Sequence, residues 1–107
     1  MKNRKEFFKY IEKNKITVVK FTAKWCKPCK ECQPFVEKCL ELLSPEVDFI
    51  KIDIDEGTGV DSYLRVQAVP TFWAFCYENP ILVAEGSDEE AILDFFKKVA
   101  VECDKIL

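Results

Sequence analysis

A strand that leads into a helix through two closely spaced cysteines constrains the fold of this chain more than any other feature. Ile16–Thr22 is rich in β-branched and aromatic residues, which predicts a strand. The motif Cys26-Lys27-Pro28-Cys29 follows, directly after Trp25, and the residues beyond it repeat with a helical period. A C-x-x-C motif between a strand and a helix is typical of thiol–disulfide chemistry.

The start of a helix is a favourable position for a reactive cysteine. Unpaired backbone N–H groups and the positive end of the helix dipole favour a thiolate, which is the form that attacks disulfides. Pro28 fits an early helical position, where the N–H that it lacks would have no partner. We therefore interpret Cys26 and Cys29 as a redox pair; the alternative is two ordinary buried cysteines.

The remaining hydrophobic patterns predict strands that alternate with helices, followed by a hairpin and a last helix. This order indicates a parallel strand unit with an added antiparallel pair, and thus an α/β fold. We expect helices over Arg4–Asn14, Pro28–Leu43, Val60–Leu64 and from a cap at Ser87-Asp88 to Cys103, and strands over Ile16–Thr22, Val47–Ile54, Thr71–Tyr77 and Ile81–Ala84.

Composition excludes several classes of function. The 107 residues carry a net charge of only −3 with both signs mixed, which argues against nucleic acid as a partner. The apolar runs are too short to span a membrane, and the N-terminus lacks the apolar core of a signal peptide. We expect one domain over residues 1–107, a cytoplasmic location and a monomer.

The chain contains six cysteines and no histidine. The absence of histidine excludes a Cys-His zinc site, a Cys-His nucleophile pair and a Ser-His-Asp triad. Cys32 extends the motif to C-x-x-C-x-x-C, but Val36 stands where an iron–sulfur run needs its next cysteine. We expect no metal and no cofactor, with metal binding kept as the alternative. Inert packing is expected for Cys39, Cys76 and Cys103, unless Cys103 is exposed enough to link two chains.

Three segments together resemble the thioredoxin family, and they span almost the whole chain. The first is Phe21–Lys30, which holds the two cysteines; the second is Val69-Pro70-Thr71, similar to the family's cis-proline loop; the third is Gly86 after the last strand. The resemblance implies a thioredoxin fold, in which helices flank a central mixed sheet of four strands, with five strands as the alternative. It also implies a protein-disulfide reductase.

In such a protein, an exposed Cys26 attacks a disulfide of a client protein, and the more buried Cys29 then resolves the mixed disulfide. The family is recharged by a flavin-containing thioredoxin reductase that uses NADPH. The resemblance further implies a docking surface for clients around the dithiol. Its members here are Trp25, Lys27, Pro28, Ala68, Val69, Pro70 and Gly86.

The chain departs from the family pattern at two lysines. Lys27 replaces the usual glycine, and its ammonium should favour the Cys26 thiolate and make the couple more oxidising. Lys20 replaces a buried aspartate, while Lys51 matches the lysine that normally pairs with that aspartate. Lys20 can therefore pair with Asp53, extend to solvent, or act as a partly neutral base toward Cys29.

A third departure concerns the sheet edge. The usual first strand has too few residues here, so Asp48–Asp53 is expected to form an exposed edge. The sequence thus predicts a general protein-disulfide reductase. Three alternatives are an oxidoreductase with a dedicated client, a less favoured glutaredoxin, and a non-enzymatic module that binds partners at this edge and beside Pro70.

Overall fold

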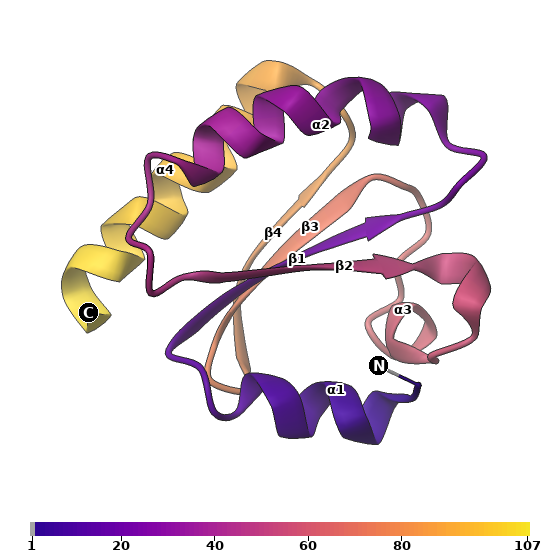
Figure 1. Ribbon diagram of the computed structural model, residues 1–107, viewed down its shortest axis with the longest axis horizontal. Coiled ribbons are helices and arrows are strands. Elements are labelled where there is room, and N and C mark those ends of the chain that lie inside the picture. The colour runs from indigo at the N-terminus through magenta and orange to yellow at the C-terminus, as the bar shows by residue number, and fades with distance from the viewer. Residues whose placement is uncertain (1) are drawn as a thin grey trace.

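A four-stranded mixed sheet forms the centre of the computed structural model, which describes residues 2–107 (Figure 1). Its strand order is β2-β1-β3-β4, with β1 and β2 parallel and the other neighbours antiparallel. The predicted thioredoxin fold is confirmed with four strands and β2 at an edge. The strands are β1 (Ile16–Thr22), β2 (Asp48–Asp53), β3 (Thr71–Cys76) and β4 (Asn79–Glu85).

Helices cover both faces of this sheet. Figure 1 shows α2 and α4 on one side and α1 and α3 on the other. Within residues 2–107, no helix is both long and apolar enough to cross a bilayer. The helices are α1 (Arg4–Ile11), α2 (Lys27–Leu40), α3 (Val60–Tyr63) and α4 (Glu89–Ile106), with a 3-10 turn at Ile54–Glu56.

Several predicted boundaries are wrong by a few residues. The helix α2 ends at Leu40 rather than Leu43, because the N–H groups of Leu42 and Leu43 bond the carbonyl three residues back and tighten the chain. The strand β4 already begins at Asn79 and includes Pro80, which an edge strand tolerates. By contrast, β1 has the predicted bounds.

Side-chain caps fix where two helices begin. The Asn3 side-chain oxygen accepts a 2.9 Å hydrogen bond from the Glu6 N–H at the start of α1. The Asp88 carboxylate accepts a 3.1 Å bond from the Ala91 N–H at the start of α4, as the sequence predicts for Ser87-Asp88. Such caps satisfy backbone donors that the helix itself leaves unpaired.

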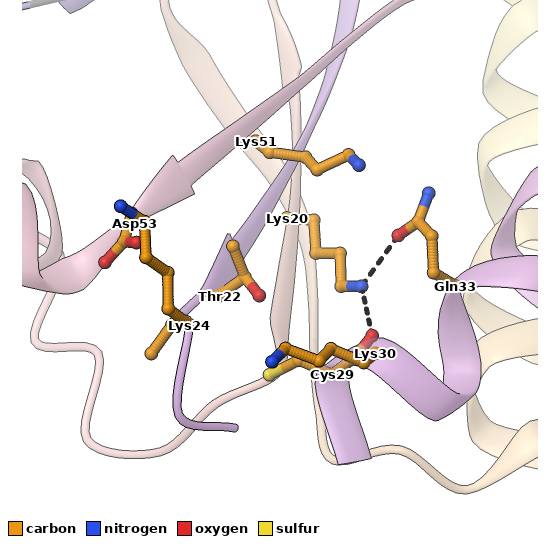
Figure 2. A pocket seen from close by; sticks show the side chains of 9 residues that line it. Lys20, Thr22, Lys24, Cys29, Lys30, Gln33, Lys51 and Asp53 are labelled. Carbon is orange, nitrogen blue, oxygen red and sulfur yellow. Dashed lines mark hydrogen bonds between the residues drawn. The ribbon is translucent and has the colours of Figure 1, made fainter. Parts of the chain in front are cut away.

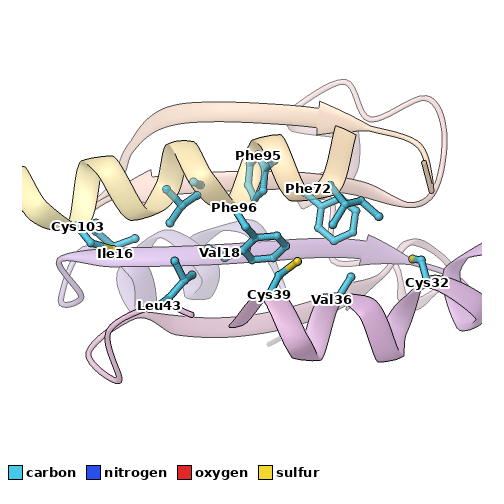
Figure 3. Packing of buried hydrophobic residues seen from close by; sticks show 13 residues of the cluster. Ile16, Val18, Cys32, Val36, Cys39, Leu43, Phe72, Phe95, Phe96 and Cys103 are labelled. Atoms are coloured by element: carbon cyan, nitrogen blue, oxygen red, sulfur yellow. The ribbon is translucent and has the colours of Figure 1, made fainter. Parts of the chain in front are cut away.

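The larger hydrophobic cluster lies between the sheet and the helices α2 and α4 (Figure 3). Phe72 of β3 packs against Phe95 and Phe96 of α4, with ring centroids 5.9 and 6.2 Å apart. A second cluster, which includes Phe7 and Phe75, joins α1 to the opposite face. Residues of β1 belong to both clusters, so this strand is packed on both faces, and the dithiol loop follows at its end.

Candidate functional site

Cys26 and Cys29 form a disulfide at the N-terminus of α2, with Cα atoms 5.3 Å apart. β1 delivers the chain to this point, and Cys26 then occupies the cap position of the helix. The Cys29 N–H donates a 3.1 Å hydrogen bond to the Cys26 sulfur. The helix thus directs a backbone donor at the sulfur that the family resemblance implies as the nucleophile, an arrangement that favours a thiolate there.

The expected exposure of Cys26 is wrong for this disulfide-bonded form. Cys26 is 3% exposed and Cys29 1%. Both pack in a small cluster with buried Ala23, against which Ile54 and Val69 lie half-buried. The difference in exposure between the two cysteines is therefore small in this form. A client disulfide needs close surface contact to reach either sulfur.

The loop before β3 flanks the disulfide. The Val69–Pro70 bond is cis, as the resemblance implies. The Val69 carbonyl oxygen lies 3.7 Å from the Cys26 sulfur, close enough to accept a hydrogen bond from a Cys26 thiol in the reduced protein. The Gly86 N–H donates a 2.8 Å bond to the Pro70 carbonyl, and Gly86 itself has φ 97°, a conformation that favours glycine. These contacts place Val69 beside the dithiol and join Gly86 to the adjacent Pro70.

Trp25 presents its indole to solvent next to the disulfide. Its side chain is 67% exposed, and its N–H donates a 2.8 Å hydrogen bond to a carboxylate oxygen of Asp55. Ala68 is also exposed, whereas Pro70 is buried. Sequence reasoning missed Asp55, which lies 30 residues away and carries no signal beyond being polar at a strand end.

The first turn of α2 contains no acidic residue. Lys27 and Pro28 occupy its first two positions, and both are exposed. The absence of a carboxylate leaves the positive end of the helix dipole uncompensated by charge on this turn. Electrostatics therefore favours negative charge at the Cys26 sulfur.

Lys20 is buried behind the disulfide, with 2% of its surface exposed. Its ammonium donates 2.7 Å hydrogen bonds to the Cys29 carbonyl oxygen and to the Gln33 side-chain oxygen (Figure 2). The proposed extension to solvent is therefore wrong, and no Lys20–Asp53 pair forms. Sequence reasoning missed Gln33, although its place one turn after Cys29 on α2 is compatible with this contact.

The charge of Lys20 is unfavourable in this position. Burial is the largest cause that lowers the pKa of Lys20 below its ordinary value, and the Lys51 ammonium lowers it further. Cys32 and Glu37 act in the opposite direction. The net effect makes the Lys20 ammonium a better proton donor than an exposed lysine.

Lys51 is the register partner of Lys20 on the neighbouring strand β2, and it is exposed. Asp53, two residues on, accepts a 2.8 Å hydrogen bond from the Asp55 N–H and so caps the 3-10 turn. Both residues line a pocket of about 360 Å³ that also reaches Lys20 and Cys29. The predicted grouping of Lys20, Lys51 and Asp53 near the buried cysteine is thus present.

The other cysteines lie away from the surface of the site. Cys32 is buried, and its sulfur lies 3.5 Å from the Cys29 carbonyl oxygen. Burial raises the pKa of the Cys39 and Cys103 thiols, which makes both poor nucleophiles at neutral pH. Cys103 is only 6% exposed, so the suggestion that it links two chains is wrong for this conformation. Cys76 is half-buried.

Comparison with known proteins gives a consistent result. The family model described as Thioredoxin matches residues 1–98. Thioredoxin 1 of Plasmodium falciparum is 33% identical over 95 residues, which cover 89% of this chain and 90% of that protein. Thioredoxin-1 of Saccharomyces cerevisiae is 37% identical over 91 residues, covering 85% and 87%. The crystal structure of oxidized mitochondrial thioredoxin 3 from Saccharomyces cerevisiae superposes with a TM-score of 0.81 at 33% identity, covering 92% of each chain.

Proposed function

The chain belongs to the thioredoxin family and is a protein-disulfide reductase, and from this premise we propose the roles of its individual residues. Cys26 is the attacking nucleophile. It forms a mixed disulfide with one sulfur of the client and releases the other as a thiolate. The observation that carries this assignment is the 3.1 Å hydrogen bond from the Cys29 N–H to the Cys26 sulfur.

Cys29 is the resolving cysteine in this proposal. Its thiolate attacks the Cys26 sulfur, which re-forms the Cys26–Cys29 disulfide and releases the client as a dithiol. The client thereby gains two electrons and the protein loses two. The helical spacing of the pair supports this step, since their Cα atoms lie 5.3 Å apart when the disulfide is closed.

Client proteins bind across the surface that surrounds the disulfide. The exposed Trp25 indole supplies apolar contact area, and the half-buried Val69 lies beside Cys26. The backbone near Val69 can pair with an extended client segment, as peptides do at a strand edge. We propose Trp25, Lys27, Pro28, Ala68, Val69 and Gly86 as this client surface; Pro70, which is buried, supports it next to Val69.

The finer assignments follow the family. We propose that a flavin-containing thioredoxin reductase returns electrons to the disulfide, so that the protein acts as an electron carrier. We further propose that residues 1–107 form one domain, and that the protein works as a monomer in the cytoplasm. Mitochondrial relatives exist among the matched thioredoxins, so fractionation of cells that express the tagged chain distinguishes the two compartments.

The roles of the two cysteines are tested by trapping a mixed disulfide with insulin. The reduced Cys29→Ser variant should form a covalent complex with insulin that a thiol reductant cleaves. Cys26 attacks an insulin disulfide in this variant, and the cysteine that would resolve the mixed disulfide is absent. The reduced Cys26→Ser variant should form none, and Cys32→Ser, as the matched control, should reduce insulin like the wild type. A complex that forms with Cys26→Ser but not with Cys29→Ser would reverse the assignment.

A further inference from the structure

We propose that the pocket behind the disulfide binds a small phosphate-bearing anion, a function separate from disulfide exchange. The pocket has a volume of about 360 Å³ and is walled by the end of β1, the loop after it, the first turns of α2, and β2. This size lies within the usual range for small-ligand pockets, about 300 to 1,000 Å³. Figure 2 shows its side chains.

Lysine is the commonest residue type among the residues that line this pocket. Lys20, Lys24, Lys30 and Lys51 all contribute to it, and Asp53 is the only carboxylate among the residues that line it. These lysines come from four separate segments, β1, the following loop, α2 and β2, so the clustering is produced by the fold and is absent from any single stretch of sequence. Such convergence of one sign of charge in a concave space raises the local concentration of anions.

None of the pocket lysines forms an ion pair with a carboxylate within residues 2–107. The ion pairs between side chains of residues 2–107 are Lys98–Asp94 and Lys105–Glu102, and both lie on α4, outside the pocket. Lys20 is the sharpest case, since it is 2% exposed and its two side-chain hydrogen bonds go to a neutral carbonyl and a neutral amide. Buried charges are normally paired with an opposite charge. An anion bound in this pocket would provide the negatively charged partner that Lys20 lacks.

The charge count favours phosphate over a single carboxylate. Lys20 and Lys51 are register partners on parallel strands, so two like charges meet on the face that the pocket covers. One carboxylate would leave most of the positive charge uncompensated, whereas a phosphate dianion offers several acceptor oxygens that separate ammonium groups can reach together. The exposed Lys24, Lys30 and Lys51 leave the pocket open to solvent.

Binding is tested on the oxidised full chain by ¹H–¹⁵N NMR titration at pH 7 and constant ionic strength. The probes are inorganic phosphate, pyrophosphate and ADP. We expect saturable shifts that are largest at the amides around Lys24, Lys30 and Lys51. If ADP binds more tightly than pyrophosphate, the ligand of the pocket is a nucleotide. If ADP binds equally or more weakly, the ligand is a free phosphate anion.

Two variants separate a site from general charge attraction. Lys24→Gln/Lys51→Gln removes two exposed pocket lysines and should weaken pyrophosphate binding at least tenfold. Lys97→Gln removes an exposed lysine of α4, which contributes nothing to the pocket, and should leave the dissociation constant within twofold. Shifts that never saturate, or equal weakening in both variants, would overturn the proposal. Because the probes bind the oxidised protein, failure here is distinct from failure of disulfide reduction.

Discussion

The Lys20 ammonium donates a 2.7 Å hydrogen bond to the backbone carbonyl oxygen of Cys29, so a buried cation contacts the cysteine that we propose as the resolving one. Gln33 holds the same ammonium from one turn further along α2. In thioredoxins this position usually carries an aspartate. A cation here stabilises negative charge in its surroundings, whereas a carboxylate would oppose it. The buried electrostatics behind the dithiol is therefore reversed in sign.

The first prediction concerns Lys20 and pH. Burial lowers the pKa of Lys20 in the folded protein below 10.5, so the unfolded chain binds this proton more tightly. Stability therefore rises with pH in the window between the lowered pKa and 10.5, and below that window the charged ammonium costs its full penalty. Urea unfolding of the oxidised protein should show the wild type gaining free energy of unfolding relative to Lys20→Met across this window.

A non-titrating control makes that comparison specific. Leu42 is 73% exposed, and Leu42→Met changes no ionisable group. Its difference from the wild type should stay constant with pH. If the difference in free energy of unfolding between the wild type and Lys20→Met were also constant with pH, Lys20 would have the same pKa in the folded and unfolded states. The proposal that its buried charge destabilises the folded protein would then be refuted.

The second prediction concerns Lys27. Its ammonium lies at the first position of α2, where it favours the Cys26 thiolate and hence the reduced protein. Lys27→Gly should make the reduction potential more negative, by about 10 to 20 mV. Lys27→Gln removes the charge without adding backbone freedom and should act in the same direction. Identical potentials in all three proteins, measured in defined thiol buffers, would contradict this role.

The third prediction concerns the hydrogen bond between Trp25 and Asp55. Asp55→Ala releases the indole, so reduction of a protein disulfide should lose about two- to tenfold in kcat/KM, mostly through KM, as expected for one exposed hydrogen bond. Asp55→Asn keeps an acceptor oxygen and should lose less. Reduction of a small aromatic disulfide, which needs little docking surface, should be unaffected by either change. An equal loss for both substrates would place Asp55 in the chemistry instead.

The fourth prediction concerns the core. Phe72 is fully buried and packs against both Phe95 and Phe96, so Phe72→Ala should lower the free energy of unfolding by about 3 to 5 kcal/mol. Leu42→Ala, at an exposed position, should change it by less than about 0.5 kcal/mol. Chemical denaturation monitored by circular dichroism measures both. A loss below 1 kcal/mol for Phe72→Ala would show that the site relaxes around the cavity.

Local patterns in the sequence predicted those features that depend on few residues. The β-branched run Ile16–Thr22 was sufficient to predict β1, a central strand in which every position but the last is buried. The Cys26–Cys29 pair was predicted from the spacing of a short motif, whereas the Val69–Pro70 cis bond was implied by the resemblance to the thioredoxin family. Helix ends were less accurate, since hydrophobic periodicity continues through the tightened turn at Leu42–Leu43.

The sequence could not predict contacts that depend on how the elements pack. Lys20 and Gln33 are hydrogen-bonded because α2 packs over β1, and no sequence pattern around either residue predicts this contact. Trp25 and Asp55 meet because the ends of β1 and β2 lie side by side. Cys26 is buried against Val69 of the loop before β3 and against Ile54, which begins the 3-10 turn. The grouping of four lysines around one pocket could not be predicted either, because the lysines come from separate segments that only the fold brings together.

Redox titration of the thiols tests the central claim most directly. The protein is equilibrated in buffers of defined thiol–disulfide ratio, free thiols are alkylated, and peptides are mapped by mass. We expect one reversible two-electron transition in which Cys26 and Cys29 change together, with a midpoint between about −270 and −200 mV. The four other cysteines should stay reduced throughout. No reversible transition, or one that maps to Cys32 in place of Cys26, would contradict the account.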